Sequence, residues 1–175
     1  MRVELVEYNP EWPKIFEQEH DLLLKDLGKS IAKIEHIGST AVTGLVSKSI
    51  IDIMIGLYNF SDADNLVPQI VNLGYIYHPE FEDMIPERRF FKKVINDKAT
   101  HHIHMVEIKG EFWQRHLLFR NYLRANPEIA KEYSILKKEL SKRDWKNGND
   151  FAEVKSKFIR KVEKQALIDK EIIPK

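Results

Sequence analysis

The chain contains no cysteine, which excludes disulfide bonds, thiolate metal ligands and a cysteine nucleophile. It lacks any apolar run of the roughly 18 residues that a membrane helix needs, and residues 1–12 have no apolar core like that of a signal peptide. Its 28 basic and 27 acidic residues leave a net charge of +1, so bulk electrostatics do not attract a polyanion. We therefore expect a cytoplasmic protein that uses neither membrane nor nucleic acid as a partner.

Hydrophobic periodicity predicts a small mixed β-sheet flanked by helices, with a helical C-terminal part. A length of 175 residues, with 43% hydrophobic and 31% charged residues, suits a single domain of residues 1–175. The expected fold class is therefore α/β or α+β. The pattern predicts helices over residues 10–27, 61–73, 111–124, 126–143 and 150–170, and strands over residues 31–37, 50–57, 75–77, 88–95 and 101–108.

Local signals place the ends of several of these elements. Ser61 with Asp64 three positions later is typical of a capping pair that opens a helix. Asn126 could cap another helix, with Pro127 at its first position. The Asn-Asp-Lys sequence of residues 96–98 suits the connection of a hairpin.

The helix predicted over residues 126–143 is strongly charged from residue 131 onward. Its apolar positions are Tyr133, Leu136 and Leu140, so we interpret the charged residues between them as a solvated face.

The strand predicted over residues 50–57 carries one acidic residue, Asp52, among apolar ones. Side chains alternate between the two faces of a strand, so Asp52 shares a face with Ile50 and Met54. The predicted core face is made of the alternating residues Ile51, Ile53, Ile55 and Leu57. We therefore expect Asp52 on the more open side of the sheet.

A turn of small residues, Gly38-Ser39-Thr40, precedes this strand. Such a turn lets backbone N–H groups approach an anion closely, and its hydroxyl groups are further donors. Asp52 on the next strand can hold the divalent cation that bridges phosphates, and Lys48 could contact a phosphate from the loop between them. The tripeptide alone also occurs in ordinary turns without a ligand. Combined with Asp52, it predicts a site for a nucleoside triphosphate.

Further segments along the chain form a recognisable set: Tyr8 to Pro13, Ile34 to Val42, Gly44-Leu45, Lys48, Ile50 to Ile53, Arg88 to Phe91, His102 to Val106, Phe119 to Arg124, Lys155 and Phe158-Ile159. With these segments the chain resembles the GrpB family of the nucleotidyltransferase superfamily over essentially its whole length. The resemblance implies a polymerase-β-like nucleotidyltransferase fold. Members of the family also occur fused to dephospho-coenzyme A kinase.

One departure from the wider superfamily concerns the metal ligands. Its active enzymes carry two acidic residues separated by one position, with a third acid from a later strand, and these hold two metal ions. In this chain the same-face neighbours of Asp52 are the apolar Ile50 and Met54. One acid is therefore missing, which counts against a two-metal centre.

His102 and His104 are candidate replacements for the missing acid. They lie two apart on the strand predicted over residues 101–108, so both imidazoles share one face, whereas Glu107 falls on the other. We expect Asp52, His102 and His104 to hold a divalent cation, Mg²⁺ or Mn²⁺. Neutral imidazoles as ligands suit Mn²⁺ or Zn²⁺. Alternatively, the pair forms hydrogen bonds within the sheet or contacts phosphate.

Other charged residues are candidates for the same site. On the strand of residues 88–95, Arg88 and Arg89 face opposite sides, so only one of them can serve a given pocket. We select Arg89, together with Arg120 from a later helix, as phosphate-binding residues. Either Glu35 or His36, which alternate before the turn, must point toward the side of Asp52.

Three functions are compatible with these residues. The leading hypothesis is metal-dependent transfer of a nucleotidyl group from a nucleoside triphosphate to an acceptor. Ser39 and Thr40 would then hold phosphates while Asp52 holds the cation. The second hypothesis is a non-catalytic module that binds a nucleotide or another phosphorylated small molecule, accessory to coenzyme A metabolism. The third is a metal-dependent phosphohydrolase that uses the same ligands with water as nucleophile.

Overall fold

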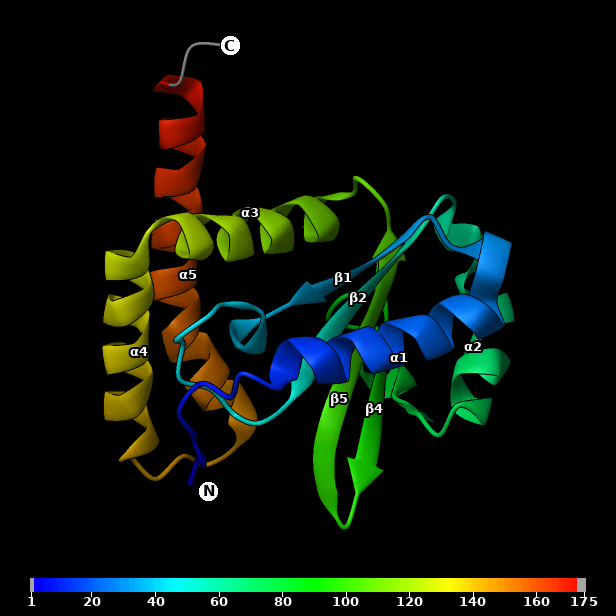
Figure 1. Ribbon diagram of the computed structural model, residues 1–175, viewed down its shortest axis with the longest axis horizontal. Coiled ribbons are helices and arrows are strands. Elements are labelled where there is room, and N and C mark those ends of the chain that lie inside the picture. Colours follow the sequence, from blue (N-terminus) through cyan, green and yellow to red (C-terminus); the bar gives the residue numbers. More distant parts are fainter. Residues whose placement is uncertain (1, 173–175) are drawn as a thin grey trace.

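The structure contains a five-stranded mixed sheet made of β1 (Lys33–Ile37), β2 (Ile51–Leu57), β3 (Ile76–Tyr77), β4 (Arg88–Ile95) and β5 (Lys98–Glu107). The strand that carries Asp52, β2, lies inside this sheet, whose order is β1-β2-β5-β4-β3. The computed structural model describes residues 2–172. In it β2 pairs with β1 in antiparallel and with β5 in parallel orientation, as Figure 1 shows.

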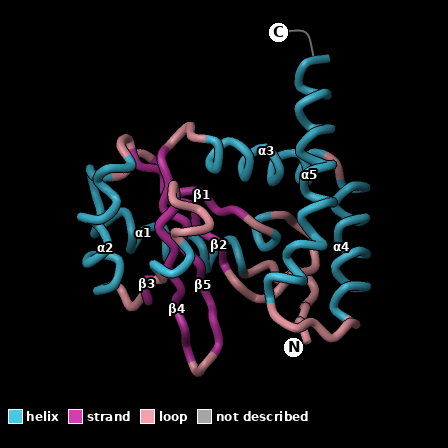
Figure 2. Tube along the Cα trace, turned by 180° about the vertical axis from the view of Figure 1, so that it is seen from behind, coloured by secondary structure: helices cyan, strands magenta, loops and turns pink. Residues whose placement is uncertain are grey.

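Helices cover both faces of this sheet and extend beyond one side of it (Figures 1 and 2). The helices are α1 (Trp12–Leu27), α2 (Ala63–Asn72), α3 (Glu111–Ala125), α4 (Pro127–Ser141) and α5 (Gly148–Ile172). The main core lies between the sheet and α1 with α2, while α3 packs on the opposite face. A further apolar cluster joins α3, α4 and α5. The mixed α/β class and the helical C-terminal part are thus confirmed.

The alternation predicted for β2 is present in the structure. Ile51, Ile53, Ile55 and Leu57 are all buried in the main core. Asp52 lies on the other face and keeps 27% of its side chain exposed. Met54, two residues farther along the same face, is fully buried because α3 covers it with Phe112 and Trp113. The open part of this face is therefore confined to the end of β2 that carries Asp52.

Two of the predicted capping interactions are wrong. α2 begins at Ala63, after a 3₁₀ turn over Phe60–Asp62, and no side chain caps it. Asp64 instead accepts a hydrogen bond from Arg89, because β4 brings this arginine beside α2. Asn126 does precede α4, but its side chain donates to the carbonyl of Tyr122 in α3 rather than capping α4.

The predicted hairpin is present with a shorter connection. β5 begins at Lys98, so only Asn96 and Asp97 join it to β4. Both residues have positive φ, 50° and 61°, as a two-residue turn between twisted strands requires. None of the helices described over residues 2–172 is both long and apolar enough to cross a membrane.

Candidate metal and phosphate site

The parallel pairing of β2 with β5 brings Asp52 and the two histidines together. Asp52 is in register with His102, and Met54 with His104, so the three polar side chains share one face. Oδ1 of Asp52 lies 3.3 Å from Nδ1 of His102 and 3.2 Å from Nε2 of His104. Candidate ligand atoms of the three residues all lie within 4.8 Å of one another. We call these residues the Asp52 cluster.

The Gly38-Ser39-Thr40 turn lies against this cluster. Gly38 follows β1 with a φ of +73°, and a Cβ built on it would be 2.7 Å from Oδ2 of Asp52. Only glycine combines that backbone conformation with so close an approach. Thr40 is buried, donates to the carbonyl of Ile50 and accepts from Nε2 of His36. Its hydroxyl therefore forms hydrogen bonds within the protein that stabilise the turn, and its proton is not available to a phosphate.

Beside the turn is a cavity of about 200 Å³ into which three lysines converge. Lys48 comes from the loop before β2, Lys137 from α4 and Lys155 from α5. The cavity is lined by Leu5, Ser39, Ser47, Lys48, Ile50, Asp52, His102, Lys137, Phe151 and Lys155. We call it the lysine pocket. Asp52 is the one carboxylate among its described lining residues, so the pocket carries an excess of positive charge.

Each lysine is held in place by a specific contact. Nζ of Lys137 donates to Oγ of Ser39 at 2.8 Å and to the carbonyl of Val46. Nζ of Lys48 and Nζ of Lys155 lie over the ring of Phe151, at 5.2 and 4.6 Å from its centre. Cation–π contacts of this kind position an ammonium group without neutralising it.

Burial changes the acid–base behaviour of these lysines. It lowers the pKa of Lys137 to about 7, aided by the charge of Lys155. Burial lowers the pKa of Lys155 to about 8, aided by the charge of Lys48 and opposed by Asp52. The pKa of Lys48 is lowered chiefly by burial as well. An anion in the pocket would oppose these effects because it stabilises the charged ammonium forms.

Asp52 and His104 have pKa shifts that favour the forms in which they can bind a cation. Burial raises the pKa of Asp52, but the hydrogen bonds from His102 and His104 outweigh it and leave the pKa well below its ordinary value. Burial lowers the pKa of His104, only partly opposed by Asp52. An ionised carboxylate beside a neutral imidazole is a ligand set for Mn²⁺ or Zn²⁺.

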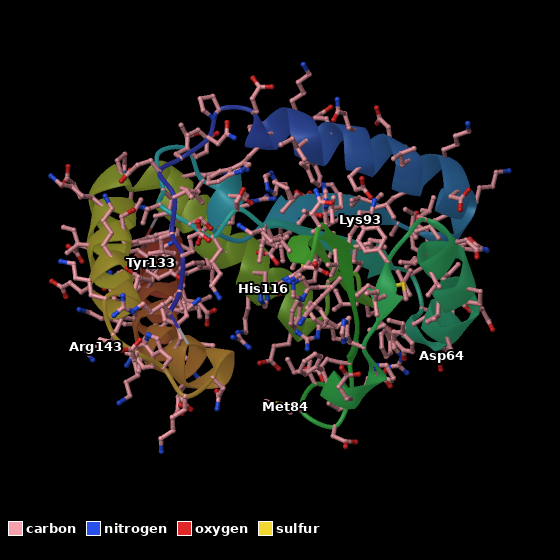
Figure 3. All side chains as sticks on the ribbon, turned by 90° about the horizontal axis from the view of Figure 1, so that it is seen from below. Asp64, Met84, Lys93, His116, Tyr133 and Arg143 are labelled. Carbon is pink, nitrogen blue, oxygen red and sulfur yellow. The ribbon has the colours of Figure 1, made fainter. Side chains whose placement is uncertain are left out.

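Six of the residues predicted for the site meet here: Gly38, Ser39, Lys48, Asp52, His102 and His104. The two selected arginines do not. Arg89 donates to Asp64 at 2.7 Å. Asp64 lies at the outer edge of the molecule beside α2, whereas His116, whose ring is near that of His104, lies near the middle (Figure 3). Arg120 is buried, where it pairs with Glu35 at 2.6 Å and donates to the carbonyl of His36.

The structure also shows which of the two residues before the turn, Glu35 or His36, points toward the side of Asp52. Glu35 is on the face of Asp52, but it is held by Arg120 and by Lys33 at 2.8 Å. His36 points to the other face, where its ring stacks on that of Phe16 at 4.7 Å. Neither side chain therefore contributes a ligand atom to the Asp52 cluster.

Sequence reasoning missed Lys137 as part of the site. The interpretation of residues 131–143 as solvated between the apolar positions is wrong at this residue, which is only 2% exposed. A signal was available, because Lys137 lies four residues after Tyr133 and three before Leu140, within the buried stripe of α4. Tyr133 is seen on the inner side of α4 in Figure 3, and Nζ of Lys137 lies 4.6 Å from the centre of its ring.

Arg88, rather than Arg89, is the arginine that faces the cluster. Its Nη1 lies 3.5 Å from Nδ1 of His104, and its guanidinium lies over the rings of Phe90 and Phe112. His116 from α3 stacks on Phe112 at 3.8 Å, and its ring centre is 6.5 Å from that of His104. Arg88 and His116 thus both lie beside His104.

Comparison with known proteins shows the family to which this chain belongs. The model of the GrpB protein family matches residues 2–165. The chain belongs to the GrpB family. The crystal structure of the conserved protein GrpB from Enterococcus faecalis is 37% identical in sequence and superposes with a TM-score of 0.85, covering 95% of this chain and 98% of that one.

The relatives of this GrpB chain include one of similar length and two that are about twice as long. The glutamate-rich protein GrpB of Alkalihalophilus pseudofirmus is 32% identical over 90% of this chain and 92% of its own. The UPF0157 protein YqkA of Bacillus subtilis is 39% identical over 94% of this chain, which spans 47% of YqkA. A dephospho-CoA kinase of Mycolicibacterium paratuberculosis is 27% identical over 94% of this chain and 46% of the kinase. This chain therefore spans about half the length of the last two.

Proposed function

We propose that this GrpB chain binds the phosphate chain of a nucleoside triphosphate together with one divalent cation, and transfers the nucleotidyl group to an acceptor. The observation that carries the proposal is that Asp52 and His102 belong both to the Asp52 cluster and to the wall of the lysine pocket. A cation on the cluster would therefore directly adjoin phosphates held by the lysines. This juxtaposition supports joint binding of a cation and a polyphosphate.

The donor set supports one cation rather than two. Asp52 supplies the carboxylate, and His102 and His104 supply two imidazoles. Met54 occupies the same-face position where a second acid would stand, and it is fully buried against α3. One carboxylate with two imidazoles favours Mn²⁺ or Zn²⁺ over Mg²⁺, which prefers oxygen ligands.

The size of the lysine pocket supports a phosphate chain as its occupant. Its volume of about 200 Å³ is below the roughly 300–1,000 Å³ of pockets that enclose a whole small molecule. The nucleoside would accordingly lie outside it. Lys48 and Lys155 would neutralise the phosphates, while Lys137 holds Ser39 in place as a further contact.

The proposed reaction is a displacement at phosphorus. A hydroxyl of the acceptor attacks the α-phosphorus and loses its proton to solvent, and the bond from this phosphorus to the bridging oxygen breaks. Pyrophosphate leaves, and the new bond is a phosphodiester. A cation held by Asp52, His102 and His104 would polarise the phosphoryl oxygens. The lysines would stabilise the charge of the departing pyrophosphate.

The buried Met54 favours one alternative, a module that binds the metal–nucleotide complex without turning it over. Product analysis separates the two. ATP and Mn²⁺ are incubated with the protein and a protein-free metabolite extract, the metal is chelated, and pyrophosphate, phosphate and AMP are quantified. Asp52→Asn removes the cation's carboxylate, and Asp64→Asn, an exposed acid on α2, is the matched control.

Transfer predicts release of pyrophosphate by the wild type and Asp64→Asn but not by Asp52→Asn. Release of phosphate alone, or of pyrophosphate with an equivalent amount of AMP, would indicate hydrolysis, with water as the nucleophile. If neither the wild type nor the variants release pyrophosphate or phosphate, although ATP binding depends on Mn²⁺, the result would favour the binding module over transfer and hydrolysis.

A further inference from the structure

A second cavity, of about 640 Å³, also adjoins the segment that contains the turn. It shares no lining residue with the lysine pocket, although Ser39 borders one cavity and Thr40 the other. Its volume falls within the range of pockets that enclose a small molecule. Its base is apolar and includes Val42, Leu123 and Ala130, which belong to the cluster that joins the helices. We call it the Arg124 pocket.

The charged groups of the Arg124 pocket are mostly basic. Glu7 is the one acid among its described lining residues, and Lys138 neutralises it at 2.7 Å. Arg124 and Lys131 also line the pocket. Among the described side chains of residues 2–172, no carboxylate forms an ion pair with Arg124 or with Lys131. Two positive charges next to an apolar surface are therefore without an ion pair among the described side chains.

Arg124 is held in a position suited to recognition. Its Nε donates to the carbonyl of Ala41 at 2.8 Å, which anchors the guanidinium at the pocket wall. The two terminal amino groups remain, and their fork matches two oxygens of one anion. Anchoring reduces the side-chain entropy lost on binding, so the contact is stronger than that of a free surface arginine.

We propose that the Arg124 pocket binds a phosphorylated small molecule with an apolar body. Two unpaired cations match the double negative charge of a phosphate monoester better than the single charge of a carboxylate. The buried apolar base contacts the rest of the ligand. This site is separate from the Asp52 cluster and does not depend on nucleotidyl transfer.

The test uses 1-naphthyl phosphate as the probe, with 1-naphthoate and 1-naphthol as its carboxylate and neutral counterparts. Binding is measured by calorimetry without metal, and its location by amide chemical shifts. The variants are Arg124→Gln and Lys131→Glu, with Lys142→Glu as the matched control, an exposed lysine at the other end of α4. Lys155→Gln reports on the lysine pocket.

The expected order of affinity is phosphate, then carboxylate, then the neutral alcohol. Arg124→Gln should weaken binding of the phosphate by about tenfold, because a charge-assisted hydrogen bond is lost. Lys131→Glu should also weaken it, whereas Lys142→Glu and Lys155→Gln should not. Lys131→Glu keeps the test valid if the loss of the Ala41 contact unfolds Arg124→Gln.

Two results would overturn the proposal. Equal binding of the phosphate and the neutral alcohol would show that charge plays no part. Loss of binding in Lys155→Gln but not in the Arg124 and Lys131 variants would place the probe in the lysine pocket. That second result would leave the proposed function intact, so the two proposals fail separately.

Discussion

Gly38 and Asp52 approach so closely that the missing side chain of the glycine makes room for the carboxylate. A Cβ at Gly38 would lie 2.7 Å from Oδ2 of Asp52. The approach arises because Ile37, the last residue of β1, is in register with Asp52 on β2. The turn that borders the lysine pocket and the carboxylate of the Asp52 cluster are thus fixed relative to each other by the sheet itself.

Gly38→Ala should destabilise the protein more than Gly44→Ala. Both glycines have positive φ, +73° and +81°, but a Cβ at Gly44 meets nothing within 4 Å. Backbone strain of about 1–3 kcal/mol applies to both, and the clash with Asp52 adds to it only at Gly38. Urea unfolding measures the difference, and Mn²⁺ affinity should fall only in Gly38→Ala. Equal stabilities and equal affinities would show that the close approach has no consequence.

Replacing either histidine of the Asp52 cluster should weaken Mn²⁺ binding. His102→Ala and His104→Ala each remove one of the three ligands, and we expect a loss of more than about tenfold in affinity. His20→Ala, on α1 at the other face of the sheet, is the control. Isothermal titration with MnCl₂ is the measurement. Unchanged affinity in both variants would mean that the histidines only hydrogen-bond to Asp52.

Arg88 should determine which nitrogen of His104 carries the proton. An arginine can only donate, so Nδ1 of His104 must accept from Nη1 of Arg88 at 3.5 Å. The proton then lies on Nε2, which donates to Asp52 at 3.2 Å. A cation on Nε2 must move this proton to Nδ1, where it would face the donor of Arg88.

Arg88→Met should therefore shift the tautomer equilibrium of His104 toward Nδ1–H, against the preference of Asp52 for Nε2–H, and increase affinity for Mn²⁺. Long-range ¹H–¹⁵N correlation spectra of the imidazole report the tautomer directly. Arg89→Met, on the adjacent residue but the opposite face, should change neither quantity. An Nδ1–H tautomer of His104 already in the metal-free wild type would contradict this role of Arg88.

The buried Lys137 should make stability rise with pH in the neutral to alkaline range. Burial lowers its pKa from the ordinary 10.5 to about 7. Between these values the unfolded chain binds more protons than the folded one, so the free energy of unfolding increases with pH, by at most about 1.4 kcal/mol per pH unit for one group. Below pH 7 the lysine is charged in both states and its burial penalty is fully present.

Lys137→Met should flatten this rise between pH 7 and 9, and Lys138→Met, its exposed neighbour, should not. Lys155 changes stability in the same direction because burial lowers its pKa to about 8, so some slope should remain. Urea unfolding at a series of pH values is the measurement. Equal slopes in the wild type and Lys137→Met would show that Lys137 is not a buried cation.

The strand-borne half of the site could be predicted from the sequence because strand periodicity alone determines it. Asp52 had to face away from Ile51, Ile53, Ile55 and Leu57, and His102 had to share a face with His104. The sequence did not determine that β2 and β5 would be neighbours in register. That pairing brings Asp52 of β2 and the two histidines of β5, which are far apart in the sequence, into one cluster.

The helix-borne half could not be predicted in the same way. Lys137 and Lys155 reach the turn only because α4 and α5 pack beside it, and helix packing angles are not visible in a single sequence. The choice between Arg88 and Arg89 depends on which face of β4 lies on the same side of the sheet as the histidines. That is decided by the register of β4 with β5, which the sequence does not give. Arg89 pairs with an acid on α2 that the sequence had suggested as a helix cap.

The most direct test of the central claim, that a cation on the Asp52 cluster and phosphates in the lysine pocket bind together, is calorimetry of ATP with and without Mn²⁺. We predict that Mn²⁺ increases the affinity of the wild type for ATP and that Asp52→Asn abolishes this increase without unfolding the protein. Lys155→Gln should weaken ATP binding under both conditions. Equal affinity of the wild type with Mn²⁺ and with a chelator, or an undiminished Mn²⁺ effect in Asp52→Asn, would contradict the claim.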